Sequence, residues 1–298
     1  MVSSPFEPDR PGEPRRRRFR GIPVRTLLPN LITLLALCAG LTGVRLAIEG
    51  KLEWAVAAIV FAAMLDGIDG RVARMLKGTS RFGAELDSLA DFFNFGVAPA
   101  LILYFWGAGL HELGNAGWIA AMVFAISGGL RLARFNATMD DPNKPAFAAN
   151  FFTGVPAPTG AITVLLPIYA AFLDLGRAPA AVTAAYTLLI AFLMVSRLPV
   201  FSGKTKRMRV PPELVLPAFV AVIVFIAILI AYPWHVLSIG TVLYLLALPL
   251  GYKSYRDQAR AMEAATPAGG EVSSPPSAPT LANLSEPPHD DDRPGRLH

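Results

Sequence analysis

Long stretches without a charged side chain constrain this 298-residue chain more than any other feature. They cover residues 26–44, 92–111, 113–130, 145–173, 178–196 and 214–252. A helix needs about 20 apolar residues to cross a bilayer, so most runs suit one crossing and the last suits two. Only 16% of the residues are charged, against about 25% in typical soluble domains. The chain is therefore predicted to be an all-α integral membrane protein.

The runs predict a polytopic bundle of about eight transmembrane helices. These are expected near residues 28–48, 54–76, 92–110, 116–136, 156–174, 179–197, 214–232 and 235–251. The ends of the chain differ from this middle part in composition. Residues 1–25 are rich in Arg and Pro and are predicted to be a basic, disordered juxtamembrane arm. The transmembrane domain is expected over 26–253, and 254–298 is predicted to be a cytoplasmic, disordered, Pro-rich tail.

The lysines and arginines between the predicted helices give an independent check on topology. With eight crossings, 20 of them lie on one side of the membrane, against Lys51 and Arg177 on the other. Because positive charge concentrates in cytoplasmic loops, both termini are predicted to be cytoplasmic, in a protein of the cytoplasmic (inner) membrane. The net charge of +5 is assigned to membrane orientation, and no nucleic-acid partner is expected.

The second predicted helix carries charges where it should be apolar. Only residues 54–65 are free of charge there, so the helix must continue through Asp66 and Asp69 to complete a crossing. Charges at membrane depth are costly and normally face the interior of the bundle. The residues with helical spacing on one face are Asp66, Asp69, Gly70, Ala73 and Arg74. The small residues leave room for a bulky ligand, and Arg74 can bind phosphate.

After a short turn, Gly83, Asp87 and Asp91 step by four and share a second helix face. Two helices joined in this way bring four carboxylates together, and these repel one another unless cations neutralise them. Oxygen ligands without His or Cys favour Mg²⁺ or Mn²⁺. Four carboxylates are enough for two such ions, the arrangement used in phosphoryl transfer. The simpler alternative is that these are loop charges that pair with Arg71, Lys77 or Arg81.

The whole pattern resembles the signature of the CDP-alcohol phosphatidyltransferase family. It runs Asp66-x2-Asp69-Gly70-x2-Ala73-Arg74-x8-Gly83-x3-Asp87-x3-Asp91. The resemblance implies that Asp66, Asp69, Asp87 and Asp91 bind two ions, Mg²⁺ or Mn²⁺, and that Asp91 is also the general base. It further implies transfer of the phosphatidyl group of CDP-diacylglycerol to an alcohol, with release of CMP. Residues implied to contact CDP-diacylglycerol are Pro29, Asn30, Thr33, Gly70, Arg74 and Ser80.

Further segments bear on the acceptor alcohol. The segments LPNLIT (28–33), GGLRLARFN (128–136), NFFTGVPAP (150–158) and SRLP (196–199) resemble the bacterial phosphatidylserine synthase branch. L-Serine is a zwitterion whose carboxylate needs a cation, so Arg131 and Arg134 are expected to bind it. Glycerol 3-phosphate or inositol phosphate, the acceptors of sister enzymes, would also need arginines and remain alternatives.

A different class of function, a cation transporter, would use the aspartates as an ion site. Transporter sites usually lie near the bilayer midplane between repeats. Here all four aspartates are predicted to cluster on the cytoplasmic side, and the motif has no second copy. An enzyme is therefore favoured over a cation transporter. The family resemblance also implies a homodimer embedded in membrane lipid.

Overall fold

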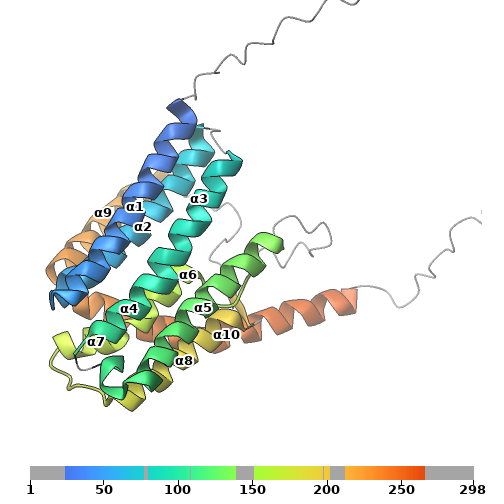
Figure 1. Cartoon of the computed structure of the whole chain (residues 1–298). Helices are drawn as coiled ribbons and strands as arrows, with labels where there is room; N and C mark the ends of the chain where they lie inside the picture. Colours follow the sequence, from blue (N-terminus) through green and yellow to red (C-terminus); the bar gives the residue numbers. More distant parts are fainter. Residues whose placement is uncertain are drawn as a thin grey trace, which may run out of the picture. The chain divides into compact units, whose positions relative to one another are not determined.

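The fold is known from a computed structural model that describes residues 24–76, 80–107, 109–138, 151–196, 198–201 and 212–265. Most of these residues are helical (Figure 1). Most of the predicted arm, 1–25, and most of the predicted tail, 254–298, lie outside the described residues, whereas residues 24 and 25 already belong to the first helix. The chain divides within its last helix into two units, Met1–Arg256 and Asp257–His298. The helices that pack together belong to the first unit, and the second unit contains only the end of the last helix among its described residues.

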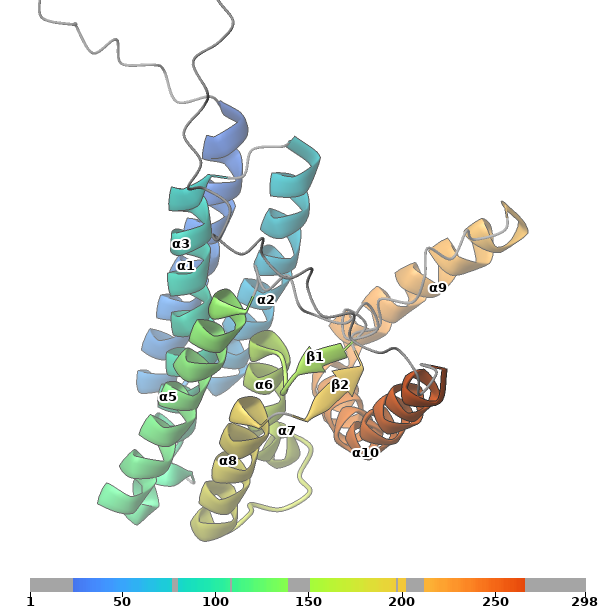
Figure 2. The same cartoon turned by 90° about the vertical axis from the view of Figure 1, so that its right-hand side faces the viewer.

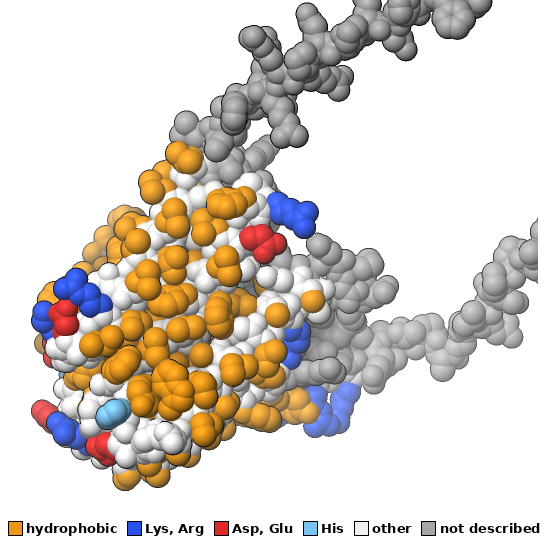
Figure 3. All heavy atoms as spheres, viewed as in Figure 1, with side chains coloured by type: hydrophobic (Ala, Val, Ile, Leu, Met, Phe, Trp, Pro, Cys, Tyr) orange, Lys and Arg blue, Asp and Glu red, His pale blue; other side chains and the backbone are white. Residues whose placement is uncertain are grey.

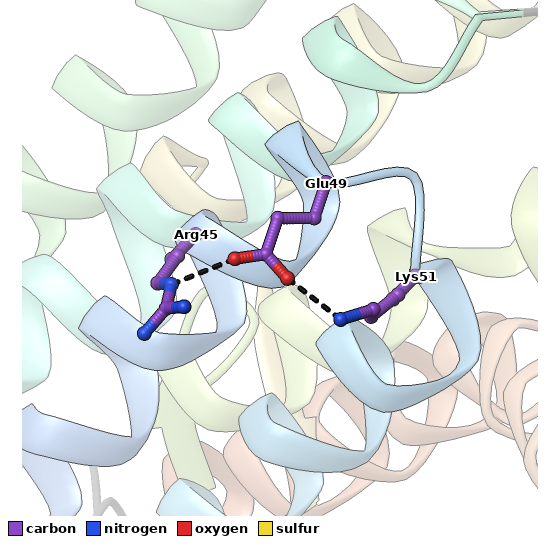
Figure 4. Close-up of polar contacts among 3 residues, drawn as sticks. All are labelled: Arg45, Glu49 and Lys51. Carbon is purple, nitrogen blue, oxygen red and sulfur yellow. Dashed lines mark hydrogen bonds and ion pairs between the residues drawn. The ribbon is translucent and has the colours of Figure 1, made fainter.

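Helices α1 (Val24–Ile48) and α2 (Leu52–Leu76) form an antiparallel pair. They lie side by side in Figure 1. Ala55, Val56, Ile59 and Ala62 form the buried face of α2. The turn between the two helices carries exposed ion pairs from Glu49 to Arg45 (2.8 Å) and Lys51 (2.9 Å), drawn in Figure 4. Exposed pairs of this kind contribute at most about 1 kcal/mol each, so apolar packing holds the pair together.

One continuous helical stretch runs from Arg81 to Phe105 and contains a π-helical segment. It consists of α3 (Arg81–Asp91), η1 (Phe92–Val97) and α4 (Ala98–Phe105). In η1 the N–H of Ala98 donates to the carbonyl of Phe93, five residues back. The membrane helix expected near 92–110 therefore begins earlier and ends earlier, because α3 continues into it without a break and the backbone turns extended at Trp106.

The next helices pack against this stretch through small residues. After the short 3₁₀ turn η2 (Leu110–Leu113) comes α5 (Asn115–Ala137), which contacts η1 and α8 (Ala180–Val195). A Cβ on Gly128 of α5 would lie 3.1 Å from the Cα of Gly96 in η1. Small residues let helix backbones approach closely in membranes. The largest fully buried side chains of the core include Phe95, Ile102, Leu103, Phe124 and Tyr169.

The helix expected over 156–174 is two shorter helices, α6 (Ala157–Val164) and α7 (Leu166–Phe172). Leu165 lies between them, and Pro167 follows in the first turn of α7, where a missing N–H costs least. Among the described residues, the all-α expectation is confirmed apart from two strands of three residues each. β1 (Phe151–Thr153) pairs antiparallel with β2 (Pro199–Phe201), with Phe152 opposite Val200 (Figure 2).

The last two helices are α9 (Pro212–Ala231) and α10 (Pro233–Ala265). No residue of α9 from Leu214 to Ala231 is buried by other described residues. Trp234, at the start of α10, packs on Tyr169 and Phe172 with ring centroids 6.3 and 4.7 Å apart. α10 continues past the predicted start of the tail at 254, since its last turns contain good helix formers such as Ala, Arg and Glu.

Five described helical segments are long and apolar enough to cross a membrane. They are Leu27–Ile48, Arg81–Phe105, Asn115–Ala137, Leu214–Ala231 and Pro233–Ser254. Ala157–Phe172 and Ala180–Val195 are apolar but shorter, and α2 carries Asp66 and Asp69 within its span. In the space-filling view, hydrophobic side chains cover the middle of the visible face, with charged groups toward its ends (Figure 3). The chain is therefore a multi-pass, helical membrane protein.

Candidate active site

Four carboxylates meet between the C-terminal half of α2 and the facing side of α3. Asp66 and Asp69 belong to α2, and Asp87 and Asp91 belong to α3. Carboxylate oxygens of Asp66, Asp69 and Asp87 all lie within 4.8 Å of one another. Asp91 lies next to this three-carboxylate cluster, since its carboxylate interacts electrostatically with Asp66, Asp69 and Asp87. The structure therefore brings together all four aspartates that the helical spacing placed on facing surfaces.

No described cation lies within ion-pair distance of these carboxylates. The ion pairs formed by the described residues join Glu49 to Arg45 and Lys51, far along the sequence from the cluster. Asp69 is only 4% exposed, so water screens its charge poorly and the mutual repulsion is strong. The donor set, carboxylate oxygens without His or Cys, fits a hard divalent cation such as Mg²⁺ or Mn²⁺.

Helix α1 contributes a hydrogen bond that orients one of the carboxylates. The hydroxyl oxygen of Thr33 lies 2.8 Å from Oδ2 of Asp69 and 3.1 Å from the carbonyl oxygen of Pro29. Because a hydroxyl has a single proton, it donates to one of these two acceptors at a time. Thr33 is 5% exposed, so this contact between α1 and α2 is buried. Such a contact fixes the rotamer of Asp69 relative to its neighbours.

A cavity of about 270 Å³ opens beside the cluster. Its lining residues are Pro29, Asn30, Thr33, Asp69, Gly70, Ala73, Arg74, Ser80, Gly83, Ala84 and Asp87. All six residues expected to contact CDP-diacylglycerol are in this lining, together with two of the aspartates. Arg74 is exposed at the rim. A guanidinium next to buried carboxylates suits a ligand that carries phosphates, provided that cations neutralise the carboxylates.

The start of α3 closes one wall of the cavity. Ser80 caps the helix, and its hydroxyl oxygen accepts a 3.0 Å hydrogen bond from the N–H of Gly83. A Cβ on Gly83 would lie 2.7 Å from Oδ1 of Asn30 in α1. Glycine at this position therefore permits the close approach of α3 to α1, which keeps Asn30 and Ser80 in the same lining.

The two arginines expected to bind the acceptor have different surroundings in α5. Arg131 is 8% exposed, and its Nε has no hydrogen-bond partner among the described residues. It interacts electrostatically with Asp91. Arg134 instead donates hydrogen bonds to the carbonyl oxygens of Val195 (2.6 Å) and Ser196 (3.2 Å). Arg131 thus interacts with Asp91, whereas Arg134 binds the carbonyl oxygens at the end of α8.

Two residues near the site were not singled out from the sequence. Asn94 in η1 is 1% exposed, and its Oδ1 has no partner in the described structure. It follows Asp91 by three residues, so its place on the aspartate face was a usable signal. Tyr244 of α10 interacts electrostatically with Arg131. The sequence of α10 does not indicate this interaction, because 113 residues separate Tyr244 from Arg131.

Comparisons with known proteins agree with this site. The model of the CDP-alcohol phosphatidyltransferase family matches residues 26–196, which include α1 to α8 and every aspartate of the cluster. A second model, CDP-alcohol phosphatidyltransferase 2, matches residues 213–249 in α9 and α10. Among curated relatives, a CDP-diacylglycerol--serine O-phosphatidyltransferase of Mycobacterium leprae is 39% identical over 82% of this chain and 79% of its own length.

Two further relatives bear the same name. The protein of Mycobacterium tuberculosis is 37% identical over 82% of this chain and 84% of its own length. That of Helicobacter pylori is 33% identical over 74% of this chain and 88% of its own length. The matched region contains the three-carboxylate cluster, the cavity and Asp91. With the fold, the aspartate geometry and the sequence matches in agreement, this chain belongs to the CDP-alcohol phosphatidyltransferase family.

Proposed function

We propose that this protein transfers the phosphatidyl group of CDP-diacylglycerol to L-serine, giving phosphatidylserine and CMP. The observation that carries the proposal is the three-carboxylate cluster beside a cavity with an arginine at its rim. That combination suits a diphosphate held by divalent cations. The relatives named above, which cover most of this chain, support serine as the acceptor.

In the proposed mechanism, Asp66, Asp69, Asp87 and Asp91 would hold two divalent ions, Mg²⁺ or Mn²⁺. Ions bound there would supply positive charge to the diphosphate and to the leaving group. The lining residues Pro29, Asn30, Thr33, Gly70, Arg74 and Ser80 bind the donor, with Arg74 available to a phosphate. These residues fix the donor so that its phosphorus next to diacylglycerol faces the acceptor.

Asp91 accepts the proton of the serine hydroxyl. The serine oxygen then forms a new bond to the phosphorus attached to diacylglycerol, and the bond from that phosphorus to the oxygen of CMP breaks. Arg131 and Arg134 supply positive charge for the serine carboxylate. Arg131 is buried and interacts with Asp91, which supports this role. A serine carboxylate bound to Arg131 would bring the serine hydroxyl close to Asp91.

We also propose the membrane arrangement that the charge distribution favours. It has eight crossings, counting α2 and the two shorter apolar stretches as spans. Both termini and the active site face the cytoplasm, and the protein lies in the cytoplasmic membrane. Residues 1–25 form a basic arm, 26–253 the transmembrane catalytic domain and 254–298 a cytoplasmic tail. The functional unit is a homodimer in membrane lipid, as the family resemblance implies.

The acceptor is tested with a panel of alcohols. Purified full-length protein is mixed with CDP-diacylglycerol, Mg²⁺ and one of four labelled acceptors: serine, glycerol 3-phosphate, inositol phosphate or choline. Transfer of label to lipid with serine alone, accompanied by CMP release, is the expected result. Transfer to glycerol 3-phosphate or inositol phosphate instead would keep the reaction type and replace the acceptor. No transfer to any acceptor would contradict the proposed function.

A further inference from the structure

Helix α10 turns a row of hydroxyl groups toward the rest of the protein. Ser238 and Thr241 are 9% and 4% exposed, and Tyr244 is half-buried. Tyr244 packs against the hydrophobic core together with Leu237 and Leu248 of the same helix. These positions recur at helical spacing, so they form the inward face of α10. Tyr244 is therefore held with its ring in apolar surroundings.

The phenolic hydroxyl of Tyr244 is buried and has no hydrogen-bond partner in the described part of the chain. The same holds for Nε of Arg131 in α5. A buried polar group without a partner costs about 1–3 kcal/mol, and native proteins contain few of them. Two such groups, one on α5 and one on α10, are what a ligand that supplies the missing acceptors would satisfy.

Electrostatic interactions connect these two groups to the proposed proton acceptor. Arg131 interacts with Asp91 in α3 on one side and with Tyr244 in α10 on the other. Arg134 also acts on Arg131, but its own donors reach the carbonyl oxygens of Val195 and Ser196. Arg131 therefore interacts with both Asp91 and Tyr244, and like Tyr244 it has a buried donor without a partner among the described residues.

From this arrangement we infer that Tyr244 binds the acceptor, its hydroxyl and the Arg131 guanidinium both donating to the serine carboxylate. The inference rests on the proposed function. A carboxylate is an acceptor-only group with two oxygens, which matches two unpartnered donors. The short serine side chain then directs its hydroxyl toward Asp91. Through Tyr244, helix α10 would contribute to acceptor specificity, although it lies outside the aspartate motif.

The test replaces Tyr244 by Phe, which keeps the ring in the core and removes only the hydroxyl. Hydrogen bonds to charged groups contribute about 1.5–3 kcal/mol, so the KM for serine is expected to rise by about tenfold or more. The kcat and the KM for CDP-diacylglycerol are expected to change less than about twofold. The matched control is Tyr252→Phe, an exposed tyrosine two turns further along α10, which should leave all three parameters unchanged.

The midpoint of thermal unfolding, measured without serine, distinguishes a binding role of the Tyr244 hydroxyl from a structural one. Removing an unpartnered hydroxyl should leave the unfolding midpoint of Tyr244→Phe equal to or above that of the wild type. The stabilisation gained on adding serine should shrink. A Tyr244→Phe protein with a lower midpoint and an unchanged KM for serine would show that the hydroxyl serves the fold, and would overturn the inference.

Failure of the inference is distinguishable from failure of the proposed function. Wild-type protein that does not release CMP on addition of serine removes the function, and the inference with it. Wild-type activity with an unchanged KM for serine in Tyr244→Phe removes the inference alone. An equal rise of the KM values for serine and CDP-diacylglycerol also contradicts it, because the hydroxyl would then act on the whole site rather than on the acceptor.

Discussion

Replacing Asp91 by Asn removes one negative charge from the site and leaves its shape nearly unchanged. The amide keeps one acceptor oxygen and adds a donor that can bind the neighbouring carboxylate of Asp66, with which Asp91 interacts electrostatically. The oxygens of Asp66, Asp69 and Asp87, which lie within 4.8 Å of one another, stay in place. The substitution therefore tests the proton acceptor without dismantling the three-carboxylate cluster.

The expected loss is in kcat. Removing a general base typically slows a reaction by about 10²–10⁴-fold, which corresponds to about 2.7–5.4 kcal/mol of activation free energy. Asp91 lies beside the cluster, so loss of its charge also weakens the attraction for a divalent cation. We therefore expect a modest rise in the Mg²⁺ concentration needed for half-maximal rate. The rates must be compared at saturating Mg²⁺ to separate the two effects.

The assay follows CMP release from CDP-diacylglycerol at varied Mg²⁺ and serine concentrations. Glu85→Gln is the matched control, because Glu85 is an exposed carboxylate on the same helix α3. It should retain wild-type kinetics. Asp66→Asn should mainly raise the Mg²⁺ requirement, since Asp66 belongs to the cluster itself. A kcat near the wild-type value for Asp91→Asn, with metal and serine saturating, would refute Asp91 as the proton acceptor.

Three further outcomes are expected. EDTA should abolish CMP release and added Mg²⁺ or Mn²⁺ should restore it, because no described cation neutralises the cluster; full activity in chelator would contradict the two-metal mechanism. In a Cys38→Ala background, Glu112→Cys should react with an impermeant maleimide outside intact cells and Ser80→Cys should not; the reverse pattern would invert the topology. Gly154→Ala should lower the stability by about 2 kcal/mol, because its φ is +78° and a Cβ would lie 2.5 Å from a carbonyl oxygen of α8. Thermal unfolding measures this, with Gly240→Ala, where a Cβ meets nothing within 4 Å, as the control.

The aspartate site was predictable from sequence because its geometry is local to two helices. Steps of three and four residues fix one face of an α-helix, so Asp66 and Asp69 had to point the same way, as did Asp87 and Asp91. The short connection between the helices then left little freedom in how the two faces meet. The continuation of α2 beyond residue 65 followed from length alone, since 12 residues cannot cross a bilayer.

The features that the sequence did not reveal depend on contacts between distant segments. The strands β1 and β2 pair Phe152 with Val200 across 48 residues, and three-residue strands have no periodicity to detect. The different surroundings of Arg131 and Arg134 arise because α8 ends beside α5 and offers its last carbonyl oxygens to one of them. Three residues apart on one helix, the two arginines look equivalent in sequence.

The π-helical segment Phe92–Val97 sets the rotation of α3 about the helix axis relative to α4, since the three segments form one continuous helix. On its C-terminal side, buried side chains such as Ile102 and Leu103 hold α4 in the core. On its N-terminal side, α3 presents Asp87 and Asp91 to α2. A π-bulge contains one residue more than the α-helix it interrupts. Deleting one residue here would restore α-helical winding and rotate α3 by about 100°. Both aspartates would then swing away from Asp66 while every apolar residue of α4 kept its place. The length of this segment therefore determines whether Asp87 and Asp91 face Asp66 at all.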